Sequence, residues 1–228
     1  MGDRALMVPR ILIDTAEIPG GDTLRLFQRG AEWSIMLGAN ELMNSRLSGS
    51  EEALATMSCE RIAGRPQPHL LIGGYGMGFT LRAALGVLGK DARATVAELV
   101  PAVIDWAKGP MAELTAGCLD DPRTEVRIAD VATLIGSARG AYDAILLDVD
   151  NGPDGLVRAA NDRLYDRDGL AAAKRALRPG GVLAIWSSAR DTVFANRLRR
   201  ARFDVEEVIV RARASGGGAH HVIWFARS

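Results

Sequence analysis

The fold is decided by the stretch Leu70-Leu71-Ile72-Gly73-Gly74-Tyr75-Gly76-Met77-Gly78. Its three leading apolar residues predict a buried strand, and the glycines after them predict a tight turn into a helix over residues 80–88. Glycines in such a turn let the main chain approach a ligand closely, at the carboxyl end of a strand and beside a helix N-terminus. We therefore expect a cofactor site at this turn, built from Gly74, Tyr75, Gly76 and Gly78.

The spacing of these glycines narrows the class of ligand. A dinucleotide fingerprint, G-x-G-x-x-G, would need its third glycine at position 79, which is Phe79. The spacing G-x-G-x-G that is present suits a nucleoside sulfonium compound such as S-adenosylmethionine. A tight strand-to-helix turn without any ligand is the alternative interpretation of the same residues.

Strand-like and helix-like patterns alternate after this stretch. Further strands are expected at residues 94–97, 125–128, 144–147 and 182–186, and helices at 101–108, 168–177 and 191–201. Such alternation predicts an α/β fold with a mostly parallel sheet that is covered on both faces. The last two expected strands, 203–210 and 221–225, are separated only by a glycine-rich turn, so the last strand is expected to be antiparallel. Residues 155–167 are expected to form a long loop or lid.

The region before the glycine stretch has a different texture. Short β-rich segments between residues 10 and 46 predict a small antiparallel meander. A helix is expected to start at Ser50, a plausible N-cap that is followed by Glu51 and Glu52. We therefore expect a small N-terminal β-region over residues 1–49 and a ligand-binding domain over residues 50–228.

Composition excludes several classes of function. The 228 residues carry 28 basic and 28 acidic side chains, so the chain has no net positive charge that would attract nucleic acid or an anionic membrane. The apolar runs are too short to cross a bilayer, and no secretory signal is visible, so a cytoplasmic location is expected. The two cysteines, Cys59 and Cys118, have no histidines at ligand spacing, and no metal site is expected.

Acidic residues follow two neighbouring strands. Glu98 ends the second strand, where a carboxylate can accept hydrogen bonds from both ribose hydroxyls of a nucleoside. Asp130 ends the third strand and can accept from the exocyclic amine of adenine. A solvated strand-end carboxylate is the alternative for Glu98, and a helix N-cap is the alternative for Asp130, where both roles are compatible.

The fourth strand runs into the acidic segment Asp148-Val149-Asp150-Asn151-Gly152-Pro153-Asp154. We expect an acidic mouth there that faces the cofactor and that orients or deprotonates a cationic or amine substrate. Asp148 and Asp150 point to the same side if the strand continues. The alternative is a turn whose Asp, Asn, Gly and Pro serve conformation alone.

Taken together, these residues resemble the spermidine synthase group within the class I S-adenosylmethionine-dependent methyltransferase fold. The resemblance is carried by the segments 71–85, 97–104, 121–123, 129–130, 142–148 and 177–181, and by the β-region before the domain. It implies a Rossmann-like fold with a seven-stranded sheet. It also implies a homodimer.

The chain departs from that family at several positions. Gly76 stands where the family has an Asp that holds the aminopropyl amine of decarboxylated S-adenosylmethionine, and Asn151 stands where the family places its catalytic Asp. The family's substrate-binding Gln and its Tyr-His pair fall on Glu41, Ser50 and Glu51. An intact cofactor brings its own carboxylate, which an Asp in the loop would repel, so Gly76 favours intact S-adenosylmethionine.

The sequence therefore predicts a small-molecule methyltransferase that uses S-adenosylmethionine. Asp148, Asp150 and Asn151 are its expected catalytic positions, and Asp148 is also an expected cofactor contact. Two alternatives remain open: aminopropyl transfer to a polyamine from decarboxylated S-adenosylmethionine, and a non-catalytic homologue that binds nucleoside. The expected partner is a small molecule, with an amine as one candidate, and neither nucleic acid nor membrane.

Overall fold

The computed structural model describes residues 8–18, 21–149, 162–213 and 218–228, and the chain divides into two compact units, Met1–Arg46 and Leu47–Ser228. In the part of the chain that is described, no helix is long and apolar enough to cross a membrane.

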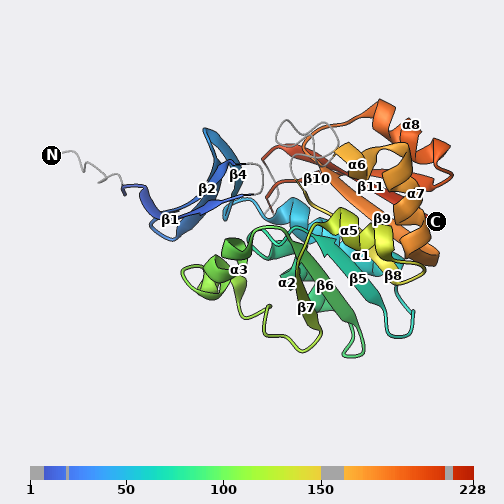
Figure 1. Cartoon of the computed structure of the whole chain (residues 1–228), viewed down its shortest axis with the longest axis horizontal. Coiled ribbons are helices and arrows are strands. Elements are labelled where there is room, and N and C mark those ends of the chain that lie inside the picture. Colours follow the sequence, from blue (N-terminus) through green and yellow to red (C-terminus); the bar gives the residue numbers. More distant parts are fainter. Residues whose placement is uncertain (1–7, 19–20, 150–161, 214–217) are drawn as a thin grey trace. The chain divides into compact units, whose positions relative to one another are not determined.

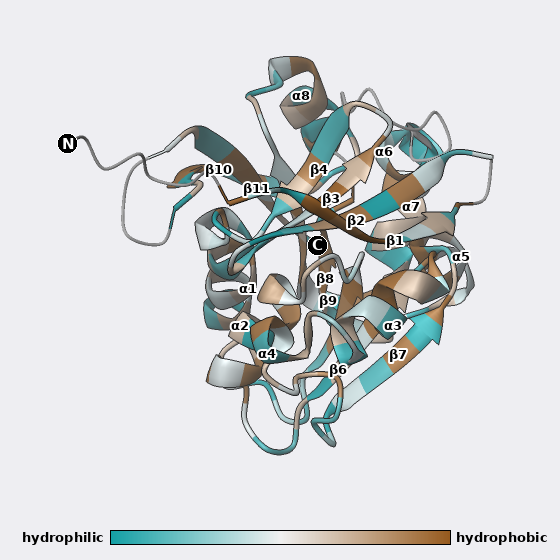
Figure 2. Cartoon of the chain, turned by 90° about the vertical axis from the view of Figure 1, so that its left-hand side faces the viewer, coloured by the Kyte–Doolittle hydropathy of each residue, from teal (hydrophilic) through white to brown (hydrophobic). Residues whose placement is uncertain are grey.

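The first unit is a four-stranded antiparallel meander. Its strands lie in the order of the sequence: β1 (Ile11–Glu17), β2 (Thr23–Arg29), β3 (Glu32–Leu37) and β4 (Asn40–Asn44). Alternation buries Leu24 and Leu26 of β2, while β1 is partly hydrophobic yet exposes Ile11 and Leu12 (Figure 2). The expected meander is confirmed, and β4 is an additional strand.

The second unit is built on a seven-stranded sheet in the order β10-β11-β9-β8-β5-β6-β7 (Figure 1). Its strands are β5 (His69–Gly73), β6 (Arg93–Glu98), β7 (Thr124–Ile128), β8 (Tyr142–Leu147), β9 (Leu177–Ser187), β10 (Asp204–Arg211) and β11 (His220–Arg227). The five neighbouring strands β9, β8, β5, β6 and β7 are parallel to one another. Strand β11 lies between β9 and β10 and is antiparallel to both. The predicted α/β fold with an antiparallel last strand is confirmed.

Helices cover this sheet. They are α1 (Gly49–Arg61), α2 (Phe79–Val87), α3 (Pro101–Lys108), α4 (Ala112–Thr115), α5 (Val131–Ser137), α6 (Asp162–Tyr165), α7 (Arg167–Ala176) and α8 (Thr192–Arg200). Helix α1 packs on α2 and contacts β8, β9, β10 and β11, and this places its first turn near the site described below. The loop or lid expected at 155–167 is partly wrong, because α6 and the start of α7 occupy residues 162–167; residues 155–161 lie outside the described part.

Strand β9 starts earlier than the sequence indicates. Residues 178–181 form an irregularity within the strand, since Tyr142 pairs with Leu177 while Ala144 already pairs with Val182. The buried Asp143 carboxylate accepts hydrogen bonds from Arg65 Nη1 at 2.9 Å and from Arg178 Nη1 at 2.7 Å. These bonds hold the widened segment against the end of the sheet.

Candidate functional site

The glycine loop connects β5 to α2 at the carboxyl edge of the sheet. Gly74, Gly76 and Gly78 all have positive φ, at 86°, 56° and 79°. A Cβ on Gly74 would lie 2.9 Å from the main-chain oxygen of Asp148, so this glycine lets the loop pack directly against the end of β8. The main chain at Gly74 thus makes a close approach, as expected, but it approaches the neighbouring strand β8. This contact packs the loop against the sheet.

The side chain of Tyr75 is buried behind the glycine loop and does not line an open binding site. The ring is buried and covers Gly78, where a Cβ would meet its hydroxyl at 2.6 Å. The Tyr75 hydroxyl lies 3.4 Å from Cys118 Sγ, and burial raises the pKa of this hydroxyl. The phenol fills space behind the loop, so the Tyr75 side chain is turned away from the cofactor contact that the sequence predicts for it.

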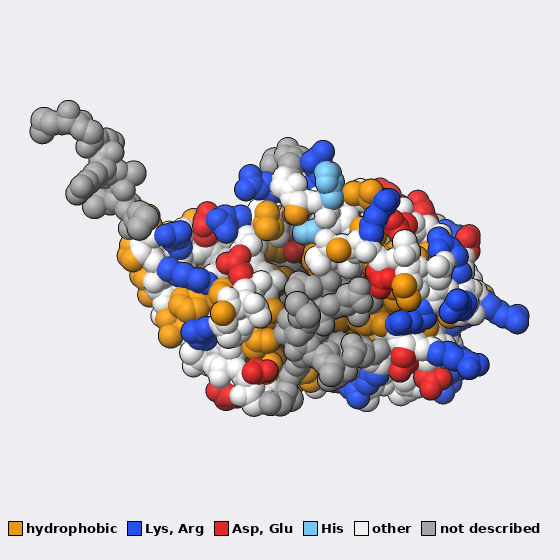
Figure 3. All heavy atoms as spheres, turned by 90° about the horizontal axis from the view of Figure 1, so that it is seen from above, with side chains coloured by type: hydrophobic (Ala, Val, Ile, Leu, Met, Phe, Trp, Pro, Cys, Tyr) orange, Lys and Arg blue, Asp and Glu red, His pale blue; other side chains and the backbone are white. Residues whose placement is uncertain are grey.

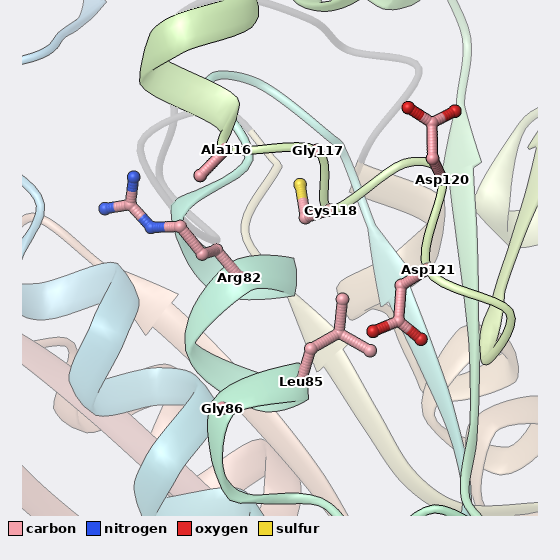
Figure 4. Close-up of a pocket in the computed structure, with 8 residues that line it drawn as sticks. All are labelled: Arg82, Leu85, Gly86, Ala116, Gly117, Cys118, Asp120 and Asp121. Carbon is pink, nitrogen blue, oxygen red and sulfur yellow. The ribbon is translucent and has the colours of Figure 1, made fainter.

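Beyond Cys118, a groove of about 380 Å³ separates α2 from residues 116–121 (Figure 4). Arg82 and Leu85 extend from α2 on one side, and Asp120 and Asp121 lie on the other. None of the residues predicted to bind cofactor lines this groove. It is therefore separate from the candidate site.

Glu98 anchors the glycine loop to the end of β6. It is 7% exposed, and its Oε2 accepts a hydrogen bond from Tyr75 N while its Oε1 accepts one from Val100 N, both at 2.9 Å. Burial raises the pKa of this carboxyl group in spite of these bonds. Each carboxylate oxygen can accept a second bond, so the predicted ribose contact stays compatible with this arrangement.

Asp130 combines two contacts at the end of β7. Its Oδ1 accepts from Ala132 N at 2.7 Å and so caps the N-terminus of α5, which was the alternative role suggested by the sequence. Its Oδ2 is paired with Arg163 of α6, 33 residues away. The predicted contact with adenine stays a prediction.

Asp148 and Glu51 form a pair of carboxyl groups beside the loop. Asp148 follows β8; its main-chain N donates to Gly73 O at 3.3 Å, and its Oδ2 lies 3.4 Å from Thr80 Oγ1. Burial of the carboxyl group raises the pKa of Asp148 to about 8, and the negative charge of Glu51 adds to this rise. Burial likewise raises the pKa of Glu51, in the first turn of α1. Among the described residues, no Lys or Arg forms an ion pair with either carboxyl group.

The carboxyl pair continues into a chain of polar contacts. Ser50 Oγ donates to Glu51 Oε2 at 2.7 Å and lies 2.9 Å from His221 Nδ1 of β11. The His221 ring packs edge-on against Trp186 of β9, with ring centroids 4.7 Å apart. From the sequence, alternation predicts that one of the adjacent His220 and His221 turns toward the core, and Trp186, at the end of the fifth expected strand, is a candidate for lining the pocket. The contacts of His221 with Ser50 and Trp186 were not predicted.

The remaining predicted residues lie outside the described part of the chain or in the first unit. Asp150, Asn151 and Asp154 lie outside the described residues. Glu41 belongs to β4 of the first unit, where its Oε1 accepts from Asn44 Nδ2 at 2.8 Å. The described site therefore consists of the loop at 74–78 together with Glu98, Asp130, Asp148, Glu51, Ser50 and His221.

Comparison with known proteins identifies what the chain is similar to. A family model described as "Spermine/spermidine synthase domain" matches residues 50–196. A polyamine aminopropyltransferase of Nitrosomonas europaea is 35% identical over 122 residues, which are 54% of this chain and 35% of the relative. Polyamine aminopropyltransferase 1 of Streptomyces coelicolor is 36% identical over 124 residues, 54% of this chain and 22% of the relative. The matches thus span only about a fifth to a third of these relatives.

Solved structures agree in fold. A spermidine synthase from Thermotoga maritima superposes with a TM-score of 0.73 at 20% identity, over 95% of this chain and 72% of that one. A spermidine synthase in complex with the transition-state analogue AdoDATO gives a TM-score of 0.72, also at 20% identity, over the same shares of the two chains.

The comparisons overturn one expectation. The prediction of a small-molecule methyltransferase is wrong, because the matching family and the relatives named above are spermidine synthases and polyamine aminopropyltransferases. The error came from treating Gly76 as the position that selects the cofactor. The carboxyl groups of Glu51 and Asp148 bring negative charge to the same region from α1 and from the end of β8.

Proposed function

The chain belongs to the spermine/spermidine synthase family, and from this premise we propose that it transfers an aminopropyl group from decarboxylated S-adenosylmethionine to a small-molecule amine. The donor differs from S-adenosylmethionine in lacking a carboxylate, so its aminopropyl group ends in an ammonium group that has no neighbouring negative charge. An acceptor amine is also a cation at neutral pH. Both substrates therefore require negative charge near the sulfonium centre.

The observation that carries this proposal is the Glu51–Asp148 carboxyl pair. The two groups lie beside the glycine loop, and within the described residues they have no basic partner. Two buried carboxyl groups without a counter-ion take up either a proton or a cation, because burial disfavours their unpaired charges. An amine substrate supplies that cation, and Asp148 is suited to receive its proton because its pKa lies near neutrality.

The other residues are assigned to holding the donor. The glycine loop at 74–78 and the N-terminus of α2 lie at the carboxyl edge of the parallel strands, where such folds bind their ligands. Glu98 is proposed to bind the ribose hydroxyls, and Asp130 the adenine. The acceptor nitrogen then attacks the carbon next to sulfur; the S–C bond breaks, and its electron pair stays on sulfur as a neutral thioether.

The test is incubation of the purified protein with decarboxylated S-adenosylmethionine and a panel of aliphatic diamines, with mass-spectrometric detection of the aminopropylated amine and of methylthioadenosine. We expect both products from the unaltered protein and at least a hundredfold slower formation from Asp148→Asn, about the loss expected when a general base is removed. Asp121→Asn, at a partly buried Asp121–Arg123 ion pair away from the site, is the matched control.

A negative result separates the alternatives. Calorimetric binding of the donor without any product would favour the non-catalytic nucleoside-binding homologue, and absence of binding would contradict the whole assignment. The homodimer also stays a prediction, which sedimentation of the purified protein checks.

A further inference from the structure

A line of polar contacts leads away from the carboxyl pair toward the other end of the chain. Glu51 Oε2 accepts from Ser50 Oγ at 2.7 Å, and the same oxygen of Ser50 lies 2.9 Å from His221 Nδ1, although Ser50 and His221 are 171 residues apart. Ser50 and Glu51 are buried, and His221 is half-buried. Histidine side chains of the protein reach the surface in Figure 3. Because His221 is partly exposed, the line starts in the interior and ends at a group with access to solvent.

This line has two complete hydrogen-bonding states. When Glu51 is ionised, His221 Nδ1–H donates to Ser50 Oγ, and the Ser50 hydroxyl donates to Glu51. When Glu51 carries a proton, every bond reverses: Glu51 donates to Ser50, and Ser50 donates to His221 Nδ1. The two states differ in proton positions alone, so a proton passes along the line without any rearrangement of heavy atoms.

We propose that Ser50 and His221 form a proton relay that carries the proton of the acceptor amine from the Glu51–Asp148 pair toward solvent. This inference rests on the function proposed above. Ser50 and His221 act through the carboxyl pair and do not touch the reacting atoms, so they are positioning residues.

The proton balance of the reaction requires such an exit. An acceptor amine enters as an ammonium ion and must lose one proton before its nitrogen lone pair can attack carbon. That proton passes to the carboxyl pair; the Glu51 proton moves to Ser50 Oγ as the Ser50 proton moves to His221 Nδ1. His221 then releases its Nε2 proton to water, which leaves the neutral ring with its proton on Nδ1, and exchange of ring protons with water restores the Nε2–H tautomer before the next turnover. One proton leaves for each aminopropyl group transferred.

The groups around His221 favour a neutral ring that is ready to accept a proton. From α1 it faces Ser50 and Glu51, from β9 it faces Trp186, and on β10 its paired residue is the uncharged Val210. Burial lowers the pKa of His221.

Trp186 gives an independent sign that this face receives a ligand. It is 9% exposed, and its Nε1 is buried without a hydrogen-bond partner in the described structure. A buried indole N–H without an acceptor is uncommon and is typical of a position that a bound molecule or water completes. Because the Trp186 ring contacts His221, this open position lies next to the relay.

The first experiment measures the pH dependence of kcat in three variants. Ser50→Ala and His221→Ala are each expected to lower kcat by about 10- to 100-fold, and His221→Gln should do the same, because Gln keeps a hydrogen bond but cannot titrate. Added imidazole should restore activity to His221→Ala. Ser58→Ala removes another buried hydroxyl of α1, and His69→Gln replaces another half-buried histidine; both controls should behave as the unaltered protein does.

The second experiment needs no substrate and is read from the apoprotein. The chain has three histidines, so the ¹⁵N signals of the His221 ring can be assigned by substitution. We expect the titration midpoint of His221 to shift in Glu51→Gln and in Ser50→Ala, and to stay unchanged in Ser58→Ala. An unshifted midpoint would show that the groups are not coupled and would overturn the relay.

The two experiments separate failure of the relay from failure of the function. If the unaltered protein transfers aminopropyl groups and His221→Gln keeps its rate and pH profile, the relay is wrong and the function stands. If the unaltered protein gives no transfer with any donor and amine, the function is wrong and the relay falls with it.

Discussion

Glu98 Oε2 accepts a hydrogen bond from Tyr75 N at 2.9 Å, so the end of β6 determines where the glycine loop of β5 lies. A carboxylate at this position thus acts on the ligand site in two ways, since it fixes the loop and is also proposed to bind the ribose. The structural part can be tested without substrate.

Glu98→Gln should destabilise the protein by about 1–3 kcal/mol, because the amide has a single acceptor oxygen and leaves one buried N–H, of Tyr75 or of Val100, without its partner. Urea denaturation measures the loss. Glu125→Gln on the neighbouring strand, at a partly exposed carboxylate paired with Arg127, should change the free energy of unfolding by less than about 1 kcal/mol. Equal effects of the two changes would contradict the anchoring role.

Replacement of Gly74 by alanine should cost about 1–3 kcal/mol, since its φ of 86° strains any side chain and the new Cβ would lie 2.9 Å from Asp148 O. The matched control is Gly136→Ala in α5, where a Cβ meets nothing within 4 Å and the helix gains about 0.5–1 kcal/mol. Thermal unfolding of both variants checks the sign of each change. A Gly74→Ala protein as stable as the parent would show that the loop is not held against β8.

The stability of the protein should fall as pH rises from about 4 to about 8. Asp148 has an ordinary pKa of 3.8 in the unfolded chain and about 8 in the folded one, so between these values the folded state binds the additional proton. Its contribution to the free energy of unfolding is therefore complete below pH 4 and is lost as pH passes through 8.

Urea denaturation at pH 5 and pH 8 tests this dependence. Asp148→Asn should reduce the difference between the two pH values by at least about 1 kcal/mol. Asp121→Asn is the control, because the Arg123 guanidinium holds the pKa of Asp121 at about 2 and its contribution does not change between pH 5 and 8. An unchanged difference in Asp148→Asn would contradict the raised pKa.

Asp143→Ala should destabilise the protein by about 3–5 kcal/mol, because the buried carboxylate accepts from Arg65, Arg178 and the main chain of His69. Glu206→Ala, which breaks an exposed ion pair with Arg61, should cost about 0–1 kcal/mol. Chemical denaturation compares the two. A small effect at Asp143 would mean that the irregular start of β9 is held by other contacts.

The sequence was sufficient for the fold and for the prediction that the candidate residues lie at one edge of the sheet. Apolar strands followed by helices predict the parallel sheet, and the ends of these strands place Gly74, Glu98, Asp130 and Asp148 at one edge. The strands and helices follow from local sequence patterns. The meeting of the strand ends follows from the parallel arrangement of the strands, which the alternation of strands and helices predicts.

Contacts between distant segments could not be predicted in the same way. Ser50 and His221 meet only because β11 pairs with β9 and β10 in one particular register, which no local pattern specifies. The ion pair between Asp130 and Arg163 depends on α6, which the sequence suggested was a loop. The wrong prediction of methyl transfer rested on one loop residue, Gly76, and no local pattern showed that Glu51 of α1 interacts with Asp148.

The insertion of β11 between β9 and β10 has a consequence for how the protein is made. Strand β11 follows all the other strands of this sheet in sequence yet is an interior member of it, so the sheet cannot close until β11 has been synthesised. Until then, the edges of β9 and β10 lack their neighbour and are open to pairing with other chains. A stop codon or a proteolytic cut just before β11 would therefore remove His221 and also split β10 from the rest of the sheet.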